Sequence, residues 1–167
     1  MIVIGYLCDY PEYRENVSRW LYDEFVHRED DDLKYETFHS NFLNNNKTKL
    51  PIRLVAIMDG KCVGTVTIID NDFYGKSYSP WLGGLYVDIP YRNEGIGQRM
   101  IDFIKQIAKD LGYYEIYLNT EHAGGYYKRL GWIYIETCLN EGGRMCEIYK
   151  YELLLRSDSF LITGRIG

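Results

Sequence analysis

The most constraining feature of the chain is a short apolar strand, a glycine-containing loop and a long amphipathic helix that follow one another without interruption. The segment runs from Leu85 through Gly97 and on to Leu111. After the loop, apolar residues recur every three or four positions, which is the period of a helix with one buried face. These residues are Ile96, Met100, Ile101, Ile104, Ile107, Ala108 and Leu111. Such a helix packs on a sheet, so the segment predicts strands and helices mixed in one layered domain.

Strand and helix patterns continue on both sides of this segment. Apolar β-rich runs predict strands over residues 2–8, 52–58, 61–69, 81–88, 114–119, 132–137 and 145–153. Asp59 and Gly60 give a strong hairpin signal between the second and third runs. Helical spacing predicts helices over 11–27, 33–42 and 96–111, with Asp9 as a cap and Pro11 opening the first. A short helix over 123–130 is weakened by two glycines, so a loop or a segment ordered by ligand are alternatives.

Composition sets aside several classes of protein. The 167 residues fit one domain, and 19 Lys and Arg stand against 24 Asp and Glu, without a basic cluster that would suit a phosphate backbone. The apolar runs fall short of the roughly 18 residues of a membrane helix, and no basic stretch precedes the apolar N-terminus. The four cysteines have neither zinc-ligand nor redox spacing. We therefore expect a cytoplasmic protein with reduced thiols that binds no nucleic acid, membrane or metal.

The acidic excess is concentrated near the N-terminus. Residues 1–50 carry 10 acidic and 6 basic side chains, and the densest run is Glu29, Asp30, Asp31 and Asp32. One interpretation is a solvated connection whose Asp residues cap the helix that follows. The other is an acidic rim that draws a cationic substrate toward a cleft.

The loop before the long helix has the chemistry of a phosphate site. Gly95 and Gly97 let the backbone approach a ligand closely, the helix N-terminus presents unpaired N–H groups, and Arg92 adds a positive charge. A dinucleotide fingerprint would require a third glycine where Met100 stands, and a P-loop would require Lys where Gln98 stands. The loop therefore suits a phosphate ligand of another kind, although a general nucleotide-binding domain remains an alternative.

Two separated motifs resemble the GNAT superfamily of acetyl-CoA-dependent N-acetyltransferases. Val87 followed by Arg92, Gly95 and Gly97 is similar to the acyl-CoA signature of that family. The downstream run 126–132, Tyr-Tyr-Lys-Arg-Leu-Gly-Trp, is similar to its second element. The resemblance covers residues 50–153 well and the first 50 only by element order. It implies a single domain over 1–167 with an α+β fold, in which a mixed, mostly antiparallel sheet is flanked by about four helices. For the tail, 154–167, pairing with another subunit, packing back and disorder all stay open.

The resemblance also implies how acetyl-CoA would be held. The pantetheine arm would pair with the strand at Leu85, Tyr86 and Val87, where two strands splay apart and Gly83 and Gly84 form a bulge. A backbone N–H near Val87 would polarise the thioester carbonyl. The positions expected to bind the cofactor are Leu85, Tyr86, Val87, Arg92, Asn93, Glu94, Gly95, Ile96, Gly97 and Asn119.

Tyr127 matches the general acid of the family, which protonates the departing thiolate. The alternative is a tyrosine that packs at a core edge, since the chain holds 17 tyrosines. The general base stays open, because Asn119 stands where some relatives carry Glu. Glu121, His122, Asp88 and ordered water are the candidates.

These features together predict an N-acetyltransferase that moves an acetyl group to a primary amine by direct attack within a ternary complex. The expected acceptor is the amine of a small molecule or peptide, with cationic polyamines and aminoglycosides favoured by the acidic N-terminal third. Six aromatic residues either line the acceptor site or belong to the core: Trp20, Tyr22, Tyr35, Phe38, Tyr78 and Trp81. The alternative function is a non-catalytic acyl-CoA sensor or partner-binding module on the same fold, and the chain is expected to be a monomer or homodimer.

Overall fold

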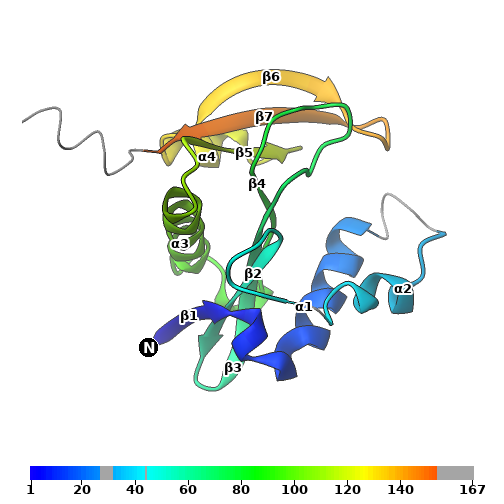
Figure 1. Ribbon diagram of the computed structural model, residues 1–167, viewed down its shortest axis with the longest axis vertical. Helices are drawn as coiled ribbons and strands as arrows, with labels where there is room; N and C mark the ends of the chain where they lie inside the picture. The colour runs from blue at the N-terminus through cyan, green and yellow to red at the C-terminus, as the bar shows by residue number, and fades with distance from the viewer. Residues whose placement is uncertain (27–31, 44, 154–167) are drawn as a thin grey trace, which may run out of the picture.

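The fold is built on one seven-stranded sheet, in which the strands lie in the order β1-β2-β3-β4-β5-β7-β6. The computed structural model describes residues 1–26, 32–43 and 45–153. All neighbouring strands are antiparallel except β4 and β5 (Figure 1). The strands are β1 (Ile2–Tyr6), β2 (Ile52–Met58), β3 (Lys61–Ile69), β4 (Trp81–Val87), β5 (Glu115–Thr120), β6 (Ile133–Leu139) and β7 (Met145–Glu152). The expected mixed, mostly antiparallel sheet is confirmed.

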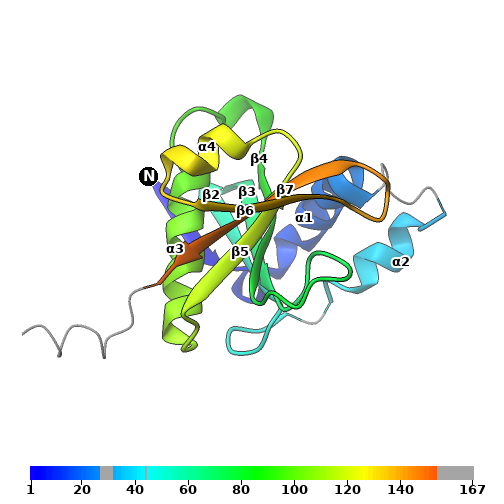
Figure 2. The ribbon, with the colours of Figure 1, turned by 90° about the horizontal axis from the view of Figure 1, so that it is seen from above.

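Helices cover both faces of this sheet. Figure 2 shows α3 (Ile96–Asp110) and α4 (Gly124–Arg129) on one face, and α1 (Arg14–Leu21) and α2 (Tyr35–Ser40) on the other. The described residues thus contain the four α-helices that were expected. None of the described helices combines the length and apolarity needed to cross a membrane.

The apolar stripe of α3 forms the larger core. Ile96, Met100, Ile101 and Ile104 are at most 1% exposed and pack against alternate residues of β2 and the neighbouring strands. Each such side chain removed from water stabilises the fold by about 1.5–3 kcal/mol. Leu111, predicted on this stripe, is instead 40% exposed, because the helix ends one residue earlier at Asp110.

The opposite face of the sheet packs on the N-terminal helices. Val55 of β2 contacts a second cluster that contains Val17 and Leu21 of α1 and Phe42 after α2. Residues of β2 alternate between the two cores, so Leu54 and Ala56 face α3 while Val55 faces α1. As a consequence Arg53, two positions before Val55, also lies on the side of α1 and α2, where its guanidinium sits over the Phe42 ring.

The strands β4 and β5 touch at one end only. Trp81 is paired with Tyr117, and Tyr117 N–H donates to the Pro80 carbonyl at 2.9 Å, but no later residue of β4 is in register with β5. Between β3 and β4, Thr65 lies opposite Tyr86 whereas Thr67 lies opposite Gly83. The extra residue in β4 is a bulge at Gly84, whose φ of +56° favours glycine. The predicted bulge and splayed strands are therefore confirmed.

The helix cap predicted at Asp9 is wrong. Asp9 does not cap the first helix, because it lies in a 3-10 turn (Leu7–Asp9) and its carboxylate pairs with Lys47 at 2.7 Å. Pro11 opens a second 3-10 turn (Pro11–Tyr13) that leads into α1 without a side-chain cap. The residue before α2 is Lys34, whose side chain makes no cap. Glu29, Asp30 and Asp31 lie outside the described residues.

The predicted helix over 11–27 is divided. The 3-10 turn and α1 are followed by a π-helical turn (Tyr22–Val26), and residue 27 lies outside the described residues. The second helix is shorter than the predicted 33–42. The first strand ends at Tyr6 rather than at residue 8. The tail 154–167 also lies outside the described residues, so the alternatives given for it stay untested.

The α4 helix forms despite its two glycines, and one of them is required by packing. A Cβ on Gly124 would overlap Glu147 Oε1 and the Tyr149 hydroxyl of β7. A Cβ on Gly125 would meet only the Arg129 guanidinium, at 3.8 Å. Gly124 therefore lets α4 approach β7, whereas Gly125 has no such function.

We expect opposite effects from alanine at these two neighbouring positions. Gly124→Ala should lower the free energy of unfolding by about 1–3 kcal/mol, because the new methyl group displaces β7 side chains. Gly125→Ala should raise it by up to about 1 kcal/mol through helix propensity alone. Urea unfolding of the two variants beside the wild type measures both changes, and equal stabilisation by both would contradict the close packing of α4 on β7.

Candidate functional site

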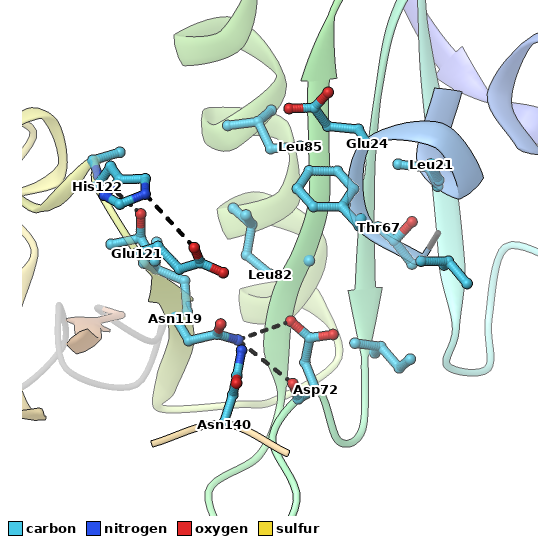
Figure 3. A pocket seen from close by; sticks show the side chains of 18 of the residues that line it. Leu21, Glu24, Thr67, Asp72, Leu82, Leu85, Asn119, Glu121, His122 and Asn140 are labelled. Carbon is cyan, nitrogen blue, oxygen red and sulfur yellow. Dashed lines mark hydrogen bonds and ion pairs between the residues drawn. The ribbon is translucent and has the colours of Figure 1, made fainter. Parts of the chain in front are cut away.

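A cleft of about 560 Å³ opens where β4 and β5 diverge. One wall comes from α1, the π-helical turn and α2, and the other from the end of β5, the β5–α4 loop and the β6–β7 loop. Figure 3 shows Leu82 and Leu85 between the two walls. The floor is thus formed by β4, including the bulge at Gly84.

The N-terminus of α3 is exposed beyond the last residue of β4. Gly95 precedes the helix with a φ of +78°, Asn93 has a φ of +65°, and no side chain caps the first turn. A Cβ on Gly97 would stand 3.8 Å from the Val87 side chain and 3.7 Å from the Tyr126 hydroxyl. Ile96 is buried, so only its backbone can reach a ligand. The first N–H groups of α3 and the positive end of its dipole can therefore attract an anion.

Arg92 ties this loop to the strand. Its Nε donates to the Val87 carbonyl at 2.8 Å, and its guanidinium carbon lies 5.4 Å from the centre of the Tyr86 ring. Tyr86 in turn packs on Trp20 of α1, with ring centres 5.2 Å apart. Arg92 and the neighbouring Glu94 are exposed. The arginine therefore combines a positive charge near the helix N-terminus with a fixed position at the end of β4.

Asn119 binds a carboxylate that the sequence analysis missed. Its Nδ2 donates to Asp72 Oδ2 at 3.1 Å (Figure 3). Asp72 belongs to the loop between β3 and β4, and its carboxylate lies 3.2 Å from where a Cβ on Gly83 would stand. The absence of a side chain at Gly83 thus makes room for Asp72 in the cleft. Asp72 and Asn119 are 47 positions apart, and no spacing pattern connects them.

Tyr127 lies in the cleft wall and is 8% exposed. Tyr126 and Trp132 hold its ring by edge-to-face contacts, at 5.3 and 5.9 Å between ring centres. Burial, with a smaller effect of Tyr126, raises the pKa of Tyr127 to about 12. The phenol is therefore protonated over the whole neutral range and can donate a proton or hydrogen bond.

The base candidates differ in position. Glu121 and His122 both line the cleft. Glu121 is 3.3 Å from Arg144 and 3.6 Å from His122, whose side chain is 92% exposed. The Asp88 carboxylate accepts a hydrogen bond from Ile89 N–H at 3.0 Å and is not among the lining residues. Geometry therefore brings Glu121 and His122 together and places Asp88 elsewhere.

Of the six aromatic residues considered for the acceptor site, Trp81 is buried in the core, and Trp20, Phe38 and Tyr78 pack at core edges. Phe38 lines the cleft. Trp81 is fully buried in a cluster with Phe73, and the Tyr35 hydroxyl is hydrogen-bonded to Ser18 at 2.9 Å. Within the part of the chain that the structure describes, His, Cys, Asp and Glu side chains form no group of three that could hold a metal ion.

Comparisons with known proteins agree with this architecture. The family model described as the acetyltransferase (GNAT) family matches residues 14–132. A solved aminoglycoside 6'-N-acetyltransferase complexed with coenzyme A has a TM-score of 0.72 at 17% identity, covering 92% of this chain and 98% of that one. The aminoglycoside 6'-N-acetyltransferase from Enterococcus faecium has a TM-score of 0.70 at 18% identity, covering 92% and 98%. A GNAT acetyltransferase from Staphylococcus aureus Mu50 has a TM-score of 0.68 at 20% identity, covering 92% and 100%. At these identities the likeness is one of fold.

The buried phenol of Tyr127 predicts a pH dependence of stability. Its folded pKa is about 12 against about 10 for an unfolded tyrosine, so above pH 10 the unfolded chain binds fewer protons than the folded one. The contribution of the protonated phenol to the free energy of unfolding is complete below pH 10. It falls by about 1.4 kcal/mol per pH unit as the pH rises toward 12. Between pH 8 and pH 11, the free energy of unfolding measured with urea should fall by about 1.4 kcal/mol more for the wild type than for Tyr127→Phe. Equal losses would contradict a buried, protonated phenol.

Proposed function

Because the chain belongs to the GNAT family of acetyltransferases, we propose that it transfers the acetyl group of acetyl-CoA to a primary amine of a small molecule or peptide. The observation that carries the proposal is the strand edge that β4 leaves free beyond Trp81. From Gly83 to Val87 this edge is roughly 16 Å long at 3.3 Å per residue. It leads from the cleft to the exposed N-terminus of α3.

These three features suit the three parts of acetyl-CoA. The pantetheine amides pair with the free edge of β4 as an added strand. The pyrophosphate accepts hydrogen bonds from the backbone between Arg92 and Gly97, with the Arg92 guanidinium beside it. The thioester then lies at the head of the cleft, beside β4. A solved neighbour of the same fold was determined with coenzyme A, which supports this assignment.

The reaction proceeds by direct attack. The amine nitrogen forms a bond to the thioester carbon, a β4 backbone N–H near Val87 stabilises the oxyanion, and the carbon–sulfur bond breaks. The phenol of Tyr127, which its raised pKa keeps protonated, lies in the cleft wall and donates its proton to the departing thiolate. The attacking nitrogen loses its second proton as the amide forms, and that proton returns through water to the phenolate. The acceptor must first lose the proton of its ammonium group, whose pKa is near ~10.4. Glu121, His122 or a water molecule takes that proton.

The cleft attracts an ammonium group. Glu24, Asp72 and Glu121 line it, and Asp72 and Glu121 stand on the side of β5 where the thioester would lie. Three carboxylates in one cleft raise the local concentration of cations. The acceptor is accordingly an amine that binds in its ammonium form and is deprotonated in the complex.

The first prediction of this proposal concerns turnover. Purified protein with acetyl-CoA should release free thiol in the presence of amines from a panel of polyamines, aminoglycosides, amino acids and short peptides. Tyr127→Phe should lower kcat by about 10²–10⁴, the usual contribution of a positioned acid, with the Kd of acetyl-CoA retained. Thiol release measured with a chromogenic reagent, and calorimetry for the Kd, separate the two effects.

Each contrary outcome has a definite meaning. Unchanged turnover in Tyr127→Phe would remove Tyr127 from the role of acid. Tight acetyl-CoA binding without thiol release from any acceptor would favour the non-catalytic sensor. Absence of acetyl-CoA binding would overturn the whole assignment of the β4 edge and the α3 N-terminus.

The second prediction concerns the phosphate end. Arg92→Glu should raise the Kd of acetyl-CoA at least about tenfold, because it replaces an attractive charge by a repulsive one and releases the loop from the Val87 carbonyl. Lys109→Glu, the same reversal at the other end of α3, is the control and should leave the Kd unchanged. Equal effects of the two variants would mean that net charge, rather than a site at Arg92, governs cofactor binding.

A further inference from the structure

Arg53 is a cation within the cleft that has no anionic partner among the described residues. It lies on β2 and lines the wall formed with α2. Its guanidinium carbon is 4.3 Å from the centre of the Phe42 ring, and Nη1 donates to Asn45 Oδ1 at 3.4 Å. Among the residues that the structure describes, no carboxylate lies within ion-pair distance of Arg53. The other cleft arginine, Arg144, is by contrast 3.3 Å from Glu121.

A half-buried guanidinium in this state is costly. Burial alone lowers the pKa of Arg53, and no neighbouring charge opposes the shift. Cations held away from water are ordinarily paired with a carboxylate or phosphate, because an unpaired charge there loses hydration without compensation. Contact with Phe42 and a long hydrogen bond to a neutral amide replace only part of that hydration. The site is therefore suited to an anion that arrives with the ligand.

Thr67 adds a second polar group beside Arg53. The two residues are directly opposite each other on β2 and β3 and share a face of the sheet. Thr67 is 7% exposed, lines the cleft, and its hydroxyl makes no hydrogen bond to another described residue. A guanidinium fork and a hydroxyl side by side are the donors that a planar carboxylate accepts.

Arg53, Thr67 and Gly83 lie side by side on three neighbouring strands, and this row ends at the carboxylates across the cleft. Thr67 is opposite Gly83 of β4, and the Asp72 carboxylate lies over Gly83 and is held by Asn119. Arg53 and Gly83 are two strands apart, which is about 10 Å at the usual strand spacing. Figure 3 shows Thr67, Asp72 and Asn119 around β4 within one cleft. Positive and negative poles thus face the same space.

We propose that the acceptor is an amine that also carries a carboxylate, with the carboxylate bound by Arg53 and Thr67 and the ammonium turned toward Asp72 and Glu121. This inference rests on the proposed acetyltransferase function and narrows its substrate class. Polyamines and other purely cationic acceptors would bring a positive charge to Arg53, so they are poor substrates. Amino acids and their longer relatives, in which several atoms separate the two charges, match both poles.

The test compares amines that differ only in the carboxylate. Amino acids with increasing separation of amine and carboxylate are each assayed beside the corresponding carboxamide, by thiol release from acetyl-CoA. For the best amino acid, the wild type should have a kcat/KM at least tenfold higher than for the corresponding carboxamide. Arg53→Gln should reduce this preference to less than threefold, with the Kd of acetyl-CoA unchanged.

Two further variants make the result specific. Arg53→Lys retains the charge but not the planar fork, so an intermediate preference is expected; it also serves if Arg53→Gln does not fold. Arg19→Gln removes an exposed arginine of α1 that lies over Tyr35 and outside the cleft, and its preference should equal that of the wild type.

The inference is overturned if carboxamides or polyamines are used as well as carboxylates by the wild type, or if Arg53→Gln keeps the full preference. Failure of the acetyltransferase function would look different, because no amine would release thiol. In that event, calorimetry measures the binding of each amino acid and of its carboxamide to the complex of the protein with coenzyme A. Carboxylate binding that depends on Arg53 would support the anion site, and binding that ignores the carboxylate would refute it.

Discussion

The single point of contact between β4 and β5 governs the rest of the molecule. Stacked aromatic rings close the two strands at one end, where Tyr78 lies 4.8 Å from Tyr117 and Trp81 is fully buried. Beyond the single pair of Trp81 and Tyr117 the two strands separate, and the bulge at Gly84 turns β4 away from β5. A sheet edge in the middle of a sheet is otherwise avoided, because its N–H and C=O groups need partners. Here that edge is the feature that a bound extended ligand would complete.

Two cores of different composition hold the divergent strands in place. The face under α3 is packed mainly with aliphatic side chains, together with Tyr127, Trp132 and Tyr149, so the helix and its N-terminus are fixed at the end of β4. The face under α1 and α2 leaves a cleft lined by charged and polar groups. Rigid support on one face and an open, charged cavity on the other is the arrangement that positions a cofactor and still admits a second substrate.

Within the cleft, the charged groups are not interchangeable. Glu121 is engaged by Arg144 and His122, and Asp72 by Asn119, so both carboxylates have fixed positions. Among the described residues, the Arg53 guanidinium is held by an aromatic ring and a neutral amide. The cleft therefore has a negative side with defined partners and a positive side whose partner would come from the ligand, and this asymmetry gives a bound molecule an orientation.

The sequence by itself determined the elements whose signal is local. The periodic stripe of α3, the hairpin at Asp59 and Gly60 and the glycine loop before the helix could be read from neighbouring residues, since burial on one face leaves a period in the chain. Tyr127 was singled out by its resemblance to the family motif instead. The role of Asp9 could not be read in this way, because a short 3-10 turn and a distant Lys47 decided what that residue does. The pairing of Asp72 with Asn119 and the placement of Arg53 opposite Thr67 were decided only by the tertiary structure. Strand register and the spreading of β4 from β5 bring these residues together across the sheet, and neither leaves a pattern in the sequence.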